Sequence, residues 1–361
     1  MSDELRAMYN REVVEGLAAM VAAVHPAFPS ARFVEEVVAD LPPLKLMERA
    51  QRMAEGFQAH LPQDYPTALA ILVKSLPAEA MQEGSFRYLP YLNFVSRYGL
   101  DHPEQSLEAI AVMTRYFTAE FDVRPFIVKH PDLTWACIHR WSKDADWRVR
   151  RLSTEGIRPR LPWGTRLQDL VKNPAPVRPI IDLLHSDPHD SVRRSCANSL
   201  NDIAKDHPDL AVEIAGGWTT KWEVRHALRT LVKKGHPGAL ALLGFGGGDA
   251  LDLSGLTLAP PTVVFGTGLE FSFTLASREA AAVDLSIDYA IHHRKANGQL
   301  APKVFKLTSK RLEPGQSITV SKRHAIRPIT TRVYYPGLHK LEILVNGRSL
   351  GSHEFILEMA G

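Results

Sequence analysis

The residues best suited to chemistry surround a short motif, Val followed by Arg, that recurs along one part of the chain. It occurs at Val123, Val149, Val192 and Val224, with the irregular spacing that HEAT-like repeats show. Aligning the last three copies gives equivalent positions at Arg151, Arg194 and His226, then Glu155, Asn198 and Thr230, then Pro159, Asp202 and Lys234. Because residues four apart share a helix face, stacked repeats would gather these positions into one polar column on a concave surface.

The basic residues of this column are suited to binding phosphate groups. Basic residues outnumber acidic ones between residues 139 and 160, and Arg193, Arg194 and Lys205 extend the patch. A groove with this charge would bind a nucleic-acid backbone, although a solvated face with ion pairs explains the composition about as well. Glu155 projects from the same stripe beside Arg151 and should be ionised, with an intrahelical ion pair as its structural alternative.

The tryptophans all fall within the same stretch of the chain, between residues 135 and 222. Their rings could stack on bases or hold a cationic base, while core packing is the commoner role for any one of them. Trp163 lies in the loop RPRLPWGT, where flanking prolines make burial less obligatory. We therefore expect Trp163 to be the aromatic residue that contacts nucleic acid.

The elements that must position these residues change type near residue 245. Up to that point apolar residues recur at helical spacing, and frequent prolines separate short helices. After a glycine-rich linker at residues 244–248, the segments LEFSFTLAS, VDLSIDYAI, KVFKLTS, SITVSK, KLEILVNG and HEFILE predict at least six strands. We expect a multidomain chain, α then β, with an α-solenoid of HEAT-like helical repeats over residues 1–248 and an immunoglobulin-like β-sandwich over residues 249–361.

The overall composition narrows the class of protein. The 361 residues are 45% hydrophobic with a net charge of +3, so nucleic-acid binding would depend on local patches. Only Cys137 and Cys196 are present, which offers neither a disulfide framework nor a metal-binding spacing. The segment MSDELRAMYN lacks the features of a signal peptide, and no apolar run approaches 18 residues. We expect a cytoplasmic protein without a membrane segment.

Three stretches of the helical part of the sequence resemble a known family. WRVRRLSTEGIRPRLPWG, SVRRSCANSLNDIAKDHPDL and WEVRHALRTLVKKGHPGALALLGF together resemble the AlkC branch of the HEAT-like-repeat alkylpurine DNA glycosylases, and the trailing sandwich matches one branch of that family. The resemblance implies DNA repair by hydrolysis of the N-glycosidic bond of cationic N-alkylated bases, 3-methyladenine above all. It also implies double-stranded DNA as the partner, association with the nucleoid when bound, and no metal or organic cofactor.

Within this resemblance, a carboxylate suits the task of stabilising the sugar oxocarbenium that forms as the base leaves. Glu155 is the leading candidate, with Glu120 second and Asp202 a weaker third. The candidates for DNA contact are Arg151, Arg158, Arg160, Trp163, Arg193, Arg194, Asn198, Lys205, His226, Lys233 and Lys234. No lysine stands out as a nucleophile for strand cleavage, so we expect a monofunctional enzyme. We also expect it to act as a monomer.

The main alternative is a HEAT-repeat scaffold without catalytic activity, whose concave face binds DNA or another protein. Salt-sensitive affinity for DNA without base release would favour a DNA-binding scaffold. Absence of DNA affinity would favour a protein-binding one, and only base release requires the enzyme.

Overall fold

The computed structural model describes residues 8–79, 85–330 and 332–359, and the chain divides into two compact units. The first unit holds the described residues up to Asp206 together with Trp218–Ala227. The second holds His207–Gly217 together with the described residues from Leu228 onward. Residues 1–7, on which the expectation of no signal peptide partly rests, lie outside the described residues. Within the described part of the chain, no helix has the length and apolar character needed to cross a membrane.

The first unit is built from short helices. They are α2 (Arg11–Val24), α3 (Ser30–Asp40), α4 (Leu46–His60), α5 (Tyr65–Ser75), α6 (Leu89–Tyr98), α7 (Pro103–Met113), α8 (Arg124–Lys129), α9 (Pro131–Trp141), α10 (Trp147–Glu155), α11 (Gln168–Lys172), α12 (Arg178–Leu184), α13 (Asp190–Ile203) and α15 (Lys221–Ala227), with 3-10 turns at Phe86–Tyr88 and Ala175–Val177. Asn10 and Asp64 cap α2 and α5 by accepting a backbone N–H from the first turn. Prolines begin α7 and α9, where the missing N–H costs nothing.

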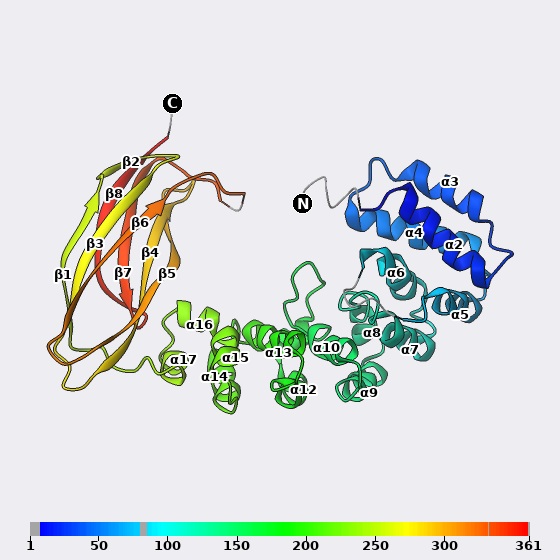
Figure 1. The fold of residues 1–361 in the computed structure, drawn as a ribbon, viewed down its shortest axis with the longest axis horizontal. Helices are drawn as coiled ribbons and strands as arrows, with labels where there is room; N and C mark the ends of the chain where they lie inside the picture. Colours follow the sequence, from blue (N-terminus) through cyan, green and yellow to red (C-terminus); the bar gives the residue numbers. More distant parts are fainter. Residues whose placement is uncertain (1–7, 80–84, 331, 360–361) are drawn as a thin grey trace. The chain divides into compact units, whose positions relative to one another are not determined.

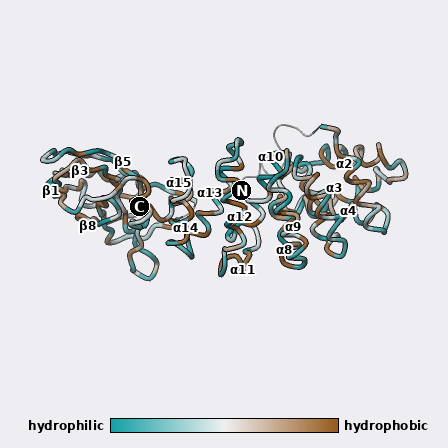
Figure 2. Tube along the Cα trace, turned by 90° about the horizontal axis from the view of Figure 1, so that it is seen from below, coloured by the Kyte–Doolittle hydropathy of each residue, from teal (hydrophilic) through white to brown (hydrophobic). Residues whose placement is uncertain are grey.

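The helices bury apolar stripes against their neighbours. Leu17 and Val21 of α2, and Val192, Cys196 and Leu200 of α13, are fully buried, and hydrophilic and hydrophobic positions alternate along the helices (Figure 2). Helix α13 packs between α10 and α15, while α9 and α12 pack against α10 and α13 as a second row (Figure 1). This arrangement confirms the predicted α-solenoid of helical repeats.

The recurrent Val-Arg motif marks the starts of α8, α10, α13 and α15, and its valines are buried. Arg150 donates to the Asp187 carboxylate at 2.6 Å and to two carbonyls in the turn before α10. Arg193 repeats the pattern, donating to Glu223 at 2.9 Å and to two carbonyls in the turn before α13. Each arginine therefore joins the start of its own helix to an acidic residue of the next repeat.

The predicted polar column forms only in part. Helix α13 carries all three of its positions on one continuous helix, at Arg194, Asn198 and Asp202. Helix α10 instead ends at Glu155, because Pro159 cannot continue a helix. Helix α15 ends at Ala227, and Thr230 lies in the separate helix α16 (Arg229–Lys233), with Lys234 beyond it. The expectation of a full three-turn column was therefore wrong for α10 and α15.

The second unit combines three helices with a β-sandwich. The helices are α14 (Pro208–Gly216), α16 and α17 (Pro237–Leu242), and the strands are β1 (Leu251–Ala259), β2 (Thr262–Val264), β3 (Gly268–Ser277), β4 (Val283–Arg294), β5 (Leu300–Leu312), β6 (Ser317–Ala325), β7 (Gly337–Val345) and β8 (Arg348–Glu358). One sheet has the order β1-β3-β6 and the other β2-β8-β7-β4-β5. The six predicted segments correspond to strands β3 to β8, except that Asn346 and Gly347 lie in the turn after β7, and β1 and β2 are additional.

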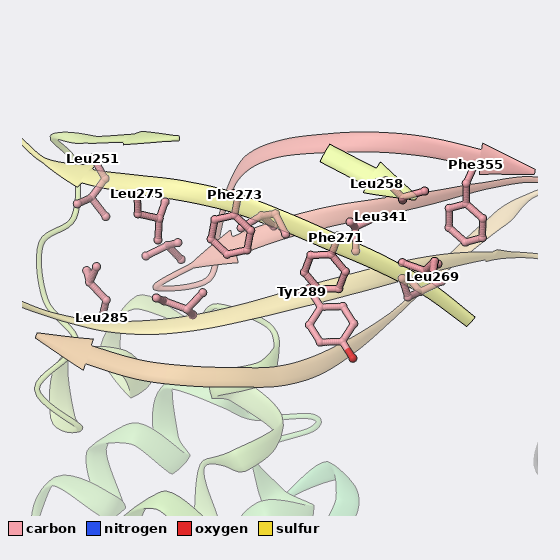
Figure 3. Close-up of a cluster of buried hydrophobic side chains, with 14 of the residues drawn as sticks. Leu251, Leu258, Leu269, Phe271, Phe273, Leu275, Leu285, Tyr289, Leu341 and Phe355 are labelled. Atoms are coloured by element: carbon pink, nitrogen blue, oxygen red, sulfur yellow. The ribbon is translucent and has the colours of Figure 1, made fainter. Parts of the chain in front are cut away.

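The core of the sandwich lies between these two sheets (Figure 3). Phe271 of β3 and Tyr289 of β4 meet across the gap with ring centroids 5.0 Å apart, and Leu285 and Phe273 lie on the same inner faces. Asn346 and Gly347 both adopt positive φ in the turn between β7 and β8, as an Asn-Gly hairpin turn requires. The immunoglobulin-like sandwich expected from the alternating sequence is confirmed.

The glycine-rich connection between α17 and β1 is tied to the sandwich. The Asn346 side chain donates to the Gly247 carbonyl at 3.1 Å. The Glu279 carboxylate accepts the backbone N–H groups of Gly248 and Ala250 at 3.0 and 2.9 Å. The expected linker therefore lies where the helices give way to strands, and its last residues are held by defined hydrogen bonds.

Candidate active site

Glu155 lies at the C-terminal end of α10 with only 5% of its surface exposed. Its Oε1 accepts a hydrogen bond from Arg158 at 2.5 Å, and its Oε2 accepts one from the Ser195 hydroxyl at 2.6 Å. Arg151 Nη2 lies 3.8 Å from Oε2. Two guanidinium groups therefore compensate the negative charge that is buried here. The intrahelical ion pair considered from the sequence is present, as one part of a larger cluster.

Arg158 bridges Glu155 to a second buried carboxylate. Its Nε donates to Asp202 Oδ2 at 2.9 Å, and Lys205 donates to the other Asp202 oxygen at 2.7 Å. Burial alone would lower the pKa of the Arg158 guanidinium, but Glu155 and Asp202 together raise it above its ordinary value. Arg158 is therefore a buried cation that holds two anions in place.

Glu120 stands on the other side of Arg151. Its Oε2 accepts hydrogen bonds from the Thr118 hydroxyl at 2.5 Å and from Arg151 Nη1 at 3.0 Å. Arg151 also donates to the Thr118 hydroxyl at 2.7 Å. One guanidinium group thus lies between the two acids, Glu120 and Glu155, that the sequence placed first and second.

Both acids line a pocket of about 650 Å³. Its walls are mostly apolar, formed by Leu46, Met47, Phe86, Leu89, Phe117, Phe121, Leu161 and Pro162, and its polar lining is formed by Thr118, Glu120, Glu155, Arg158 and Thr165. A mainly apolar hollow with a few convergent charged groups is the usual form of a ligand site. Asp202 does not line it, and is fully buried behind Arg158.

Trp163 also lines this pocket, on the loop between α10 and α11 that projects from the helices (Figure 1). Its side chain is 82% exposed and its φ is 64°, a left-handed conformation that is rare and costly for a residue other than glycine. An exposed indole held in this conformation beside two carboxylates is an arrangement that packing does not require. The structure therefore agrees with the expectation that Trp163 is not a core residue.

The Trp163 loop is anchored by Arg124, which is 2% exposed. Arg124 donates to the Thr165 carbonyl at 2.7 Å, and to the carbonyls of Gly156 and Arg158 at 2.8 and 3.0 Å. Burial lowers the pKa of this guanidinium to about 10. Sequence reasoning gave Arg124 no role, although its place in the first Val-Arg copy was a signal that could have found it.

Asp122 is a second residue that the sequence did not single out. It is 3% exposed, and its Oδ1 accepts hydrogen bonds from Ser96 at 2.8 Å and Asn93 at 3.2 Å. Its Oδ2 has no hydrogen-bond partner among the described residues. Burial raises the pKa of the Asp122 carboxyl to about 6, against the opposing effect of the two hydrogen bonds. Asp122 and Glu120, two residues apart, therefore occupy contrasting environments.

Several cations predicted to contact DNA are paired with carboxylates. Arg160 makes a bidentate pair with Asp206 at 2.6 and 2.7 Å. Arg193 is held by Glu223 in the same way as Arg150 is held by Asp187. These pairs explain the positions of Arg160 and Arg193 without DNA, so their role as DNA contacts stays a prediction.

Arg194, Asn198 and His226 gather around one exposed tryptophan. Arg194 lies over the Trp222 ring at 5.9 Å, and the His226 ring stacks on Trp222 with centroids 5.0 Å apart. His226 Nε2 lies 2.9 Å from the Asn198 side-chain oxygen. The alignment of repeats predicted that these three positions share a face, and the structure brings them together.

Lys233 and Lys234 are exposed at the end of α16, in the second unit. Among residues 8–79, 85–330 and 332–359, no group of three or more His, Cys, Asp or Glu side chains could hold a metal ion. Cys137 and Cys196 are buried and free. The carboxylates and arginines of the site can stabilise a cation that faces the pocket.

The fold and the site together define a HEAT-repeat protein with a buried acidic and basic cluster and an appended immunoglobulin-like domain. Residues 177–207 match the HEAT repeat family, and residues 252–359 match the family described as "Uncharacterised protein YhaZ, C-terminal Ig-like domain". The chain is 38% identical to "Uncharacterized protein YhaZ" of Bacillus subtilis (strain 168), over 98% of this chain and 99% of that protein.

A solved structure gives the same result with a more specific description. The alkylpurine DNA glycosylase AlkC of Pseudomonas fluorescens, bound to DNA containing an abasic site analogue, superimposes with a TM-score of 0.91. The two proteins are 38% identical, over 98% of this chain and 99% of that one. The chain belongs to the AlkC family of alkylpurine DNA glycosylases.

Proposed function

We propose that this protein is a monofunctional DNA glycosylase that removes cationic N-alkylated bases, 3-methyladenine above all, from duplex DNA. The observation that carries the proposal is the carboxylate of Glu155, buried among arginines yet lining a pocket beside the exposed Trp163. Membership of the AlkC family supports the same reaction. We further propose that it acts as a monomer in the cytoplasm, associates with the nucleoid when bound to DNA, and divides at residues 1–248 and 249–361.

The reaction adds water across the bond between the base and the sugar. The C1′–N bond breaks, its electron pair leaves with the base, and the positive charge of the alkylated base is thereby neutralised. Positive charge develops on the sugar, and water then adds to C1′ and loses a proton. Because an alkylated base already carries charge, strong protonation of the leaving group is unnecessary, and stabilisation of the sugar cation becomes the main task of the protein.

We assign that task to Glu155, with Glu120 as the second acid. A carboxylate about 4 Å from a cation, at an effective dielectric near 20, contributes roughly 4 kcal/mol. This corresponds to about a thousandfold in rate. We propose Asp202 as a positioning residue, because it lies outside the pocket and acts on Glu155 through Arg158. No metal or organic cofactor enters this scheme.

For DNA contact we propose Trp163 at the pocket, the Arg194, Asn198 and His226 cluster, and Lys233 and Lys234. We also propose Arg151 for DNA contact, because it lies between Glu120 and Glu155 beside the pocket. Four other predicted contacts would act mainly by maintaining the surface that DNA approaches. Arg158 and Lys205 hold the buried carboxylates, and Arg160 and Arg193 are paired with other acidic residues.

The test is release of bases from methylated duplex DNA, quantified by chromatography for the wild type, Glu155→Gln and Glu120→Gln. Glu108→Gln, an exposed substitution on α7, is the matched control. We expect the wild type to release 3-methyladenine without cutting the strand, and Glu155→Gln to lose about a thousandfold in rate. Its affinity for DNA carrying an abasic-site analogue should persist.

Two other outcomes of this test would favour a scaffold without catalytic activity over an enzyme. Salt-sensitive DNA binding by the wild type without base release would support a DNA-binding scaffold. Absence of DNA binding would support a scaffold for protein. Equal activity of Glu155→Gln and Glu108→Gln would leave the enzyme in place but overturn the assignment of Glu155.

A further inference from the structure

A second, smaller pocket adjoins the candidate active site. It measures about 270 Å³ and shares Phe117 and Thr118 with the larger pocket that Glu120 and Glu155 line. This volume is below the range of about 300–1,000 Å³ that suits larger organic ligands. The second pocket is therefore suited to a small polar group.

Three arginines, Arg115, Arg148 and Arg151, line this second pocket. The Thr118 and Ser191 side chains add hydroxyl groups to the lining. Guanidinium groups and hydroxyls are the donors that proteins use for phosphate oxygens. The chemistry of the lining thus selects an anion with several acceptor oxygens.

Arg115, whose side chain is 43% exposed, has one donor that no group in the described part of the chain satisfies. Its Nε is buried and has no hydrogen-bond partner among the described residues. The nearby carboxylates of Asp146 and Asp144 lie 3.7 and 3.8 Å from its nitrogens, beyond hydrogen-bond distance. A buried N–H without an acceptor is costly, and an oxygen entering the pocket would satisfy it.

The other two arginines are held in position. Arg148 lies over the Trp147 ring at 5.1 Å and pairs with Asp146 at 3.2 Å, while Trp147 stacks on His189 with ring centroids 3.8 Å apart. Arg151 is fixed by Thr118 and Glu120. The pocket is therefore built before a ligand arrives, which lowers the entropic cost of binding.

We propose that this pocket binds one backbone phosphate of DNA next to the damaged nucleotide, an inference that rests on the proposed function. Thr118 lines both pockets, and Arg151 of the smaller pocket donates to Glu120 of the larger one. A phosphate held at Arg115 would therefore place the neighbouring sugar toward Glu120 and Glu155. The pocket thereby sets the register of the DNA on the enzyme without reading its sequence.

The test measures binding to duplex DNA that carries an abasic-site analogue, with single phosphates around it replaced one at a time by uncharged methylphosphonate. Wild type is compared with Arg115→Gln, Arg115→Lys and the control Arg178→Gln, an exposed arginine on α12 that pairs with Asp182. We expect one replacement to weaken wild-type binding about tenfold, which is about 1.4 kcal/mol. Arg115→Gln should lose about tenfold on unmodified DNA and lose nothing more at that position.

The two other variants show whether the effect is specific to the Arg115 guanidinium group. Arg178→Gln should respond to every replacement as the wild type does, and Arg115→Lys should fall between, because it keeps the charge without the guanidinium fork. Equal sensitivity of Arg115→Gln and the wild type at all positions would overturn the phosphate pocket, as would an equal loss in Arg178→Gln. These outcomes concern DNA with no base to release, so they are separate from failure of the glycosylase reaction. Absence of any wild-type binding would overturn both proposals.

Discussion

Replacing Asp122 by asparagine should remove a defined part of the pH dependence of stability. The carboxyl has an ordinary pKa of 3.8, and burial raises it to about 6 in the folded chain. Between these values the folded state holds a proton that the unfolded state has released. The free energy of unfolding therefore falls as the pH rises from about 4 to about 6 and stays level above that window.

The size of the effect follows from the same two values. A shift from 3.8 to about 6 corresponds to a penalty of about 3 kcal/mol at neutral pH. About 2 kcal/mol of this develops between pH 4.5 and pH 7.5. The asparagine can keep the bonds from Ser96 and Asn93 on its oxygen, and its amide takes the place of the unpartnered Oδ2. The informative quantity is thus the change with pH, since the new amide adds a constant term.

The measurement is urea unfolding followed by tryptophan fluorescence, because all the tryptophans belong to the first unit. The difference in unfolding free energy, Asp122→Asn minus wild type, should increase by about 2 kcal/mol from pH 4.5 to pH 7.5. The exposed control Asp132→Asn should show the same difference at both values. A difference for Asp122→Asn that is constant with pH would refute the reasoning.

Three further substitutions test the loop that carries Trp163. Trp163→Gly should raise the free energy of unfolding by up to about 1 kcal/mol, because glycine tolerates the φ of 64°, yet it should lower base release about tenfold or more through lost stacking. Trp163→Ala should lose activity in the same way without the gain in stability. Full activity of either variant would contradict the assignment of Trp163 as a DNA contact. Arg124→Met removes the donors to the carbonyls of Thr165 and Gly156 and should cost about 3 kcal/mol in urea unfolding. A loss below about 1 kcal/mol would show that Arg124 does not anchor the loop.

The fold class was predictable because the helical repeats and the sandwich each show their own hydrophobic period in the sequence. Val192, Cys196 and Leu200 recur at helical spacing and are fully buried on α13, while the segment LEFSFTLAS alternates and forms β3 with Phe271 and Phe273 inside. The hydrophobic period did not predict where each helix of the polar column ends. Pro159 ended α10 one turn early, and a break after Ala227 separated α15 from α16.

Spacing along the chain predicted most directly the part of the candidate site that lies on one helix. Arg151 and Glu155 are four residues apart, and their proximity follows from helix geometry. Ser195, which donates to Glu155, comes from another helix, and the pocket wall at Leu46 and Phe86 comes from much earlier in the chain. Spacing within one helix carries no information about these contacts, because they depend on how the repeats stack.

The Val-Arg motif shows that adjacent arginines can have different surroundings, which a count of cations does not distinguish. Arg150 and Arg193 immediately follow the valine, and both are used to join one repeat to the next through Asp187 and Glu223. The next residue in each copy faces another way: Arg151 lies between the catalytic candidates, and Arg194 lies over Trp222. Adjacent arginines thus divide between joining the repeats and forming the surface that we propose contacts DNA. Because the alternation follows from helix geometry, we expect charge at the position after Val-Arg, rather than at the arginine of the motif itself, to mark DNA contact in this repeat.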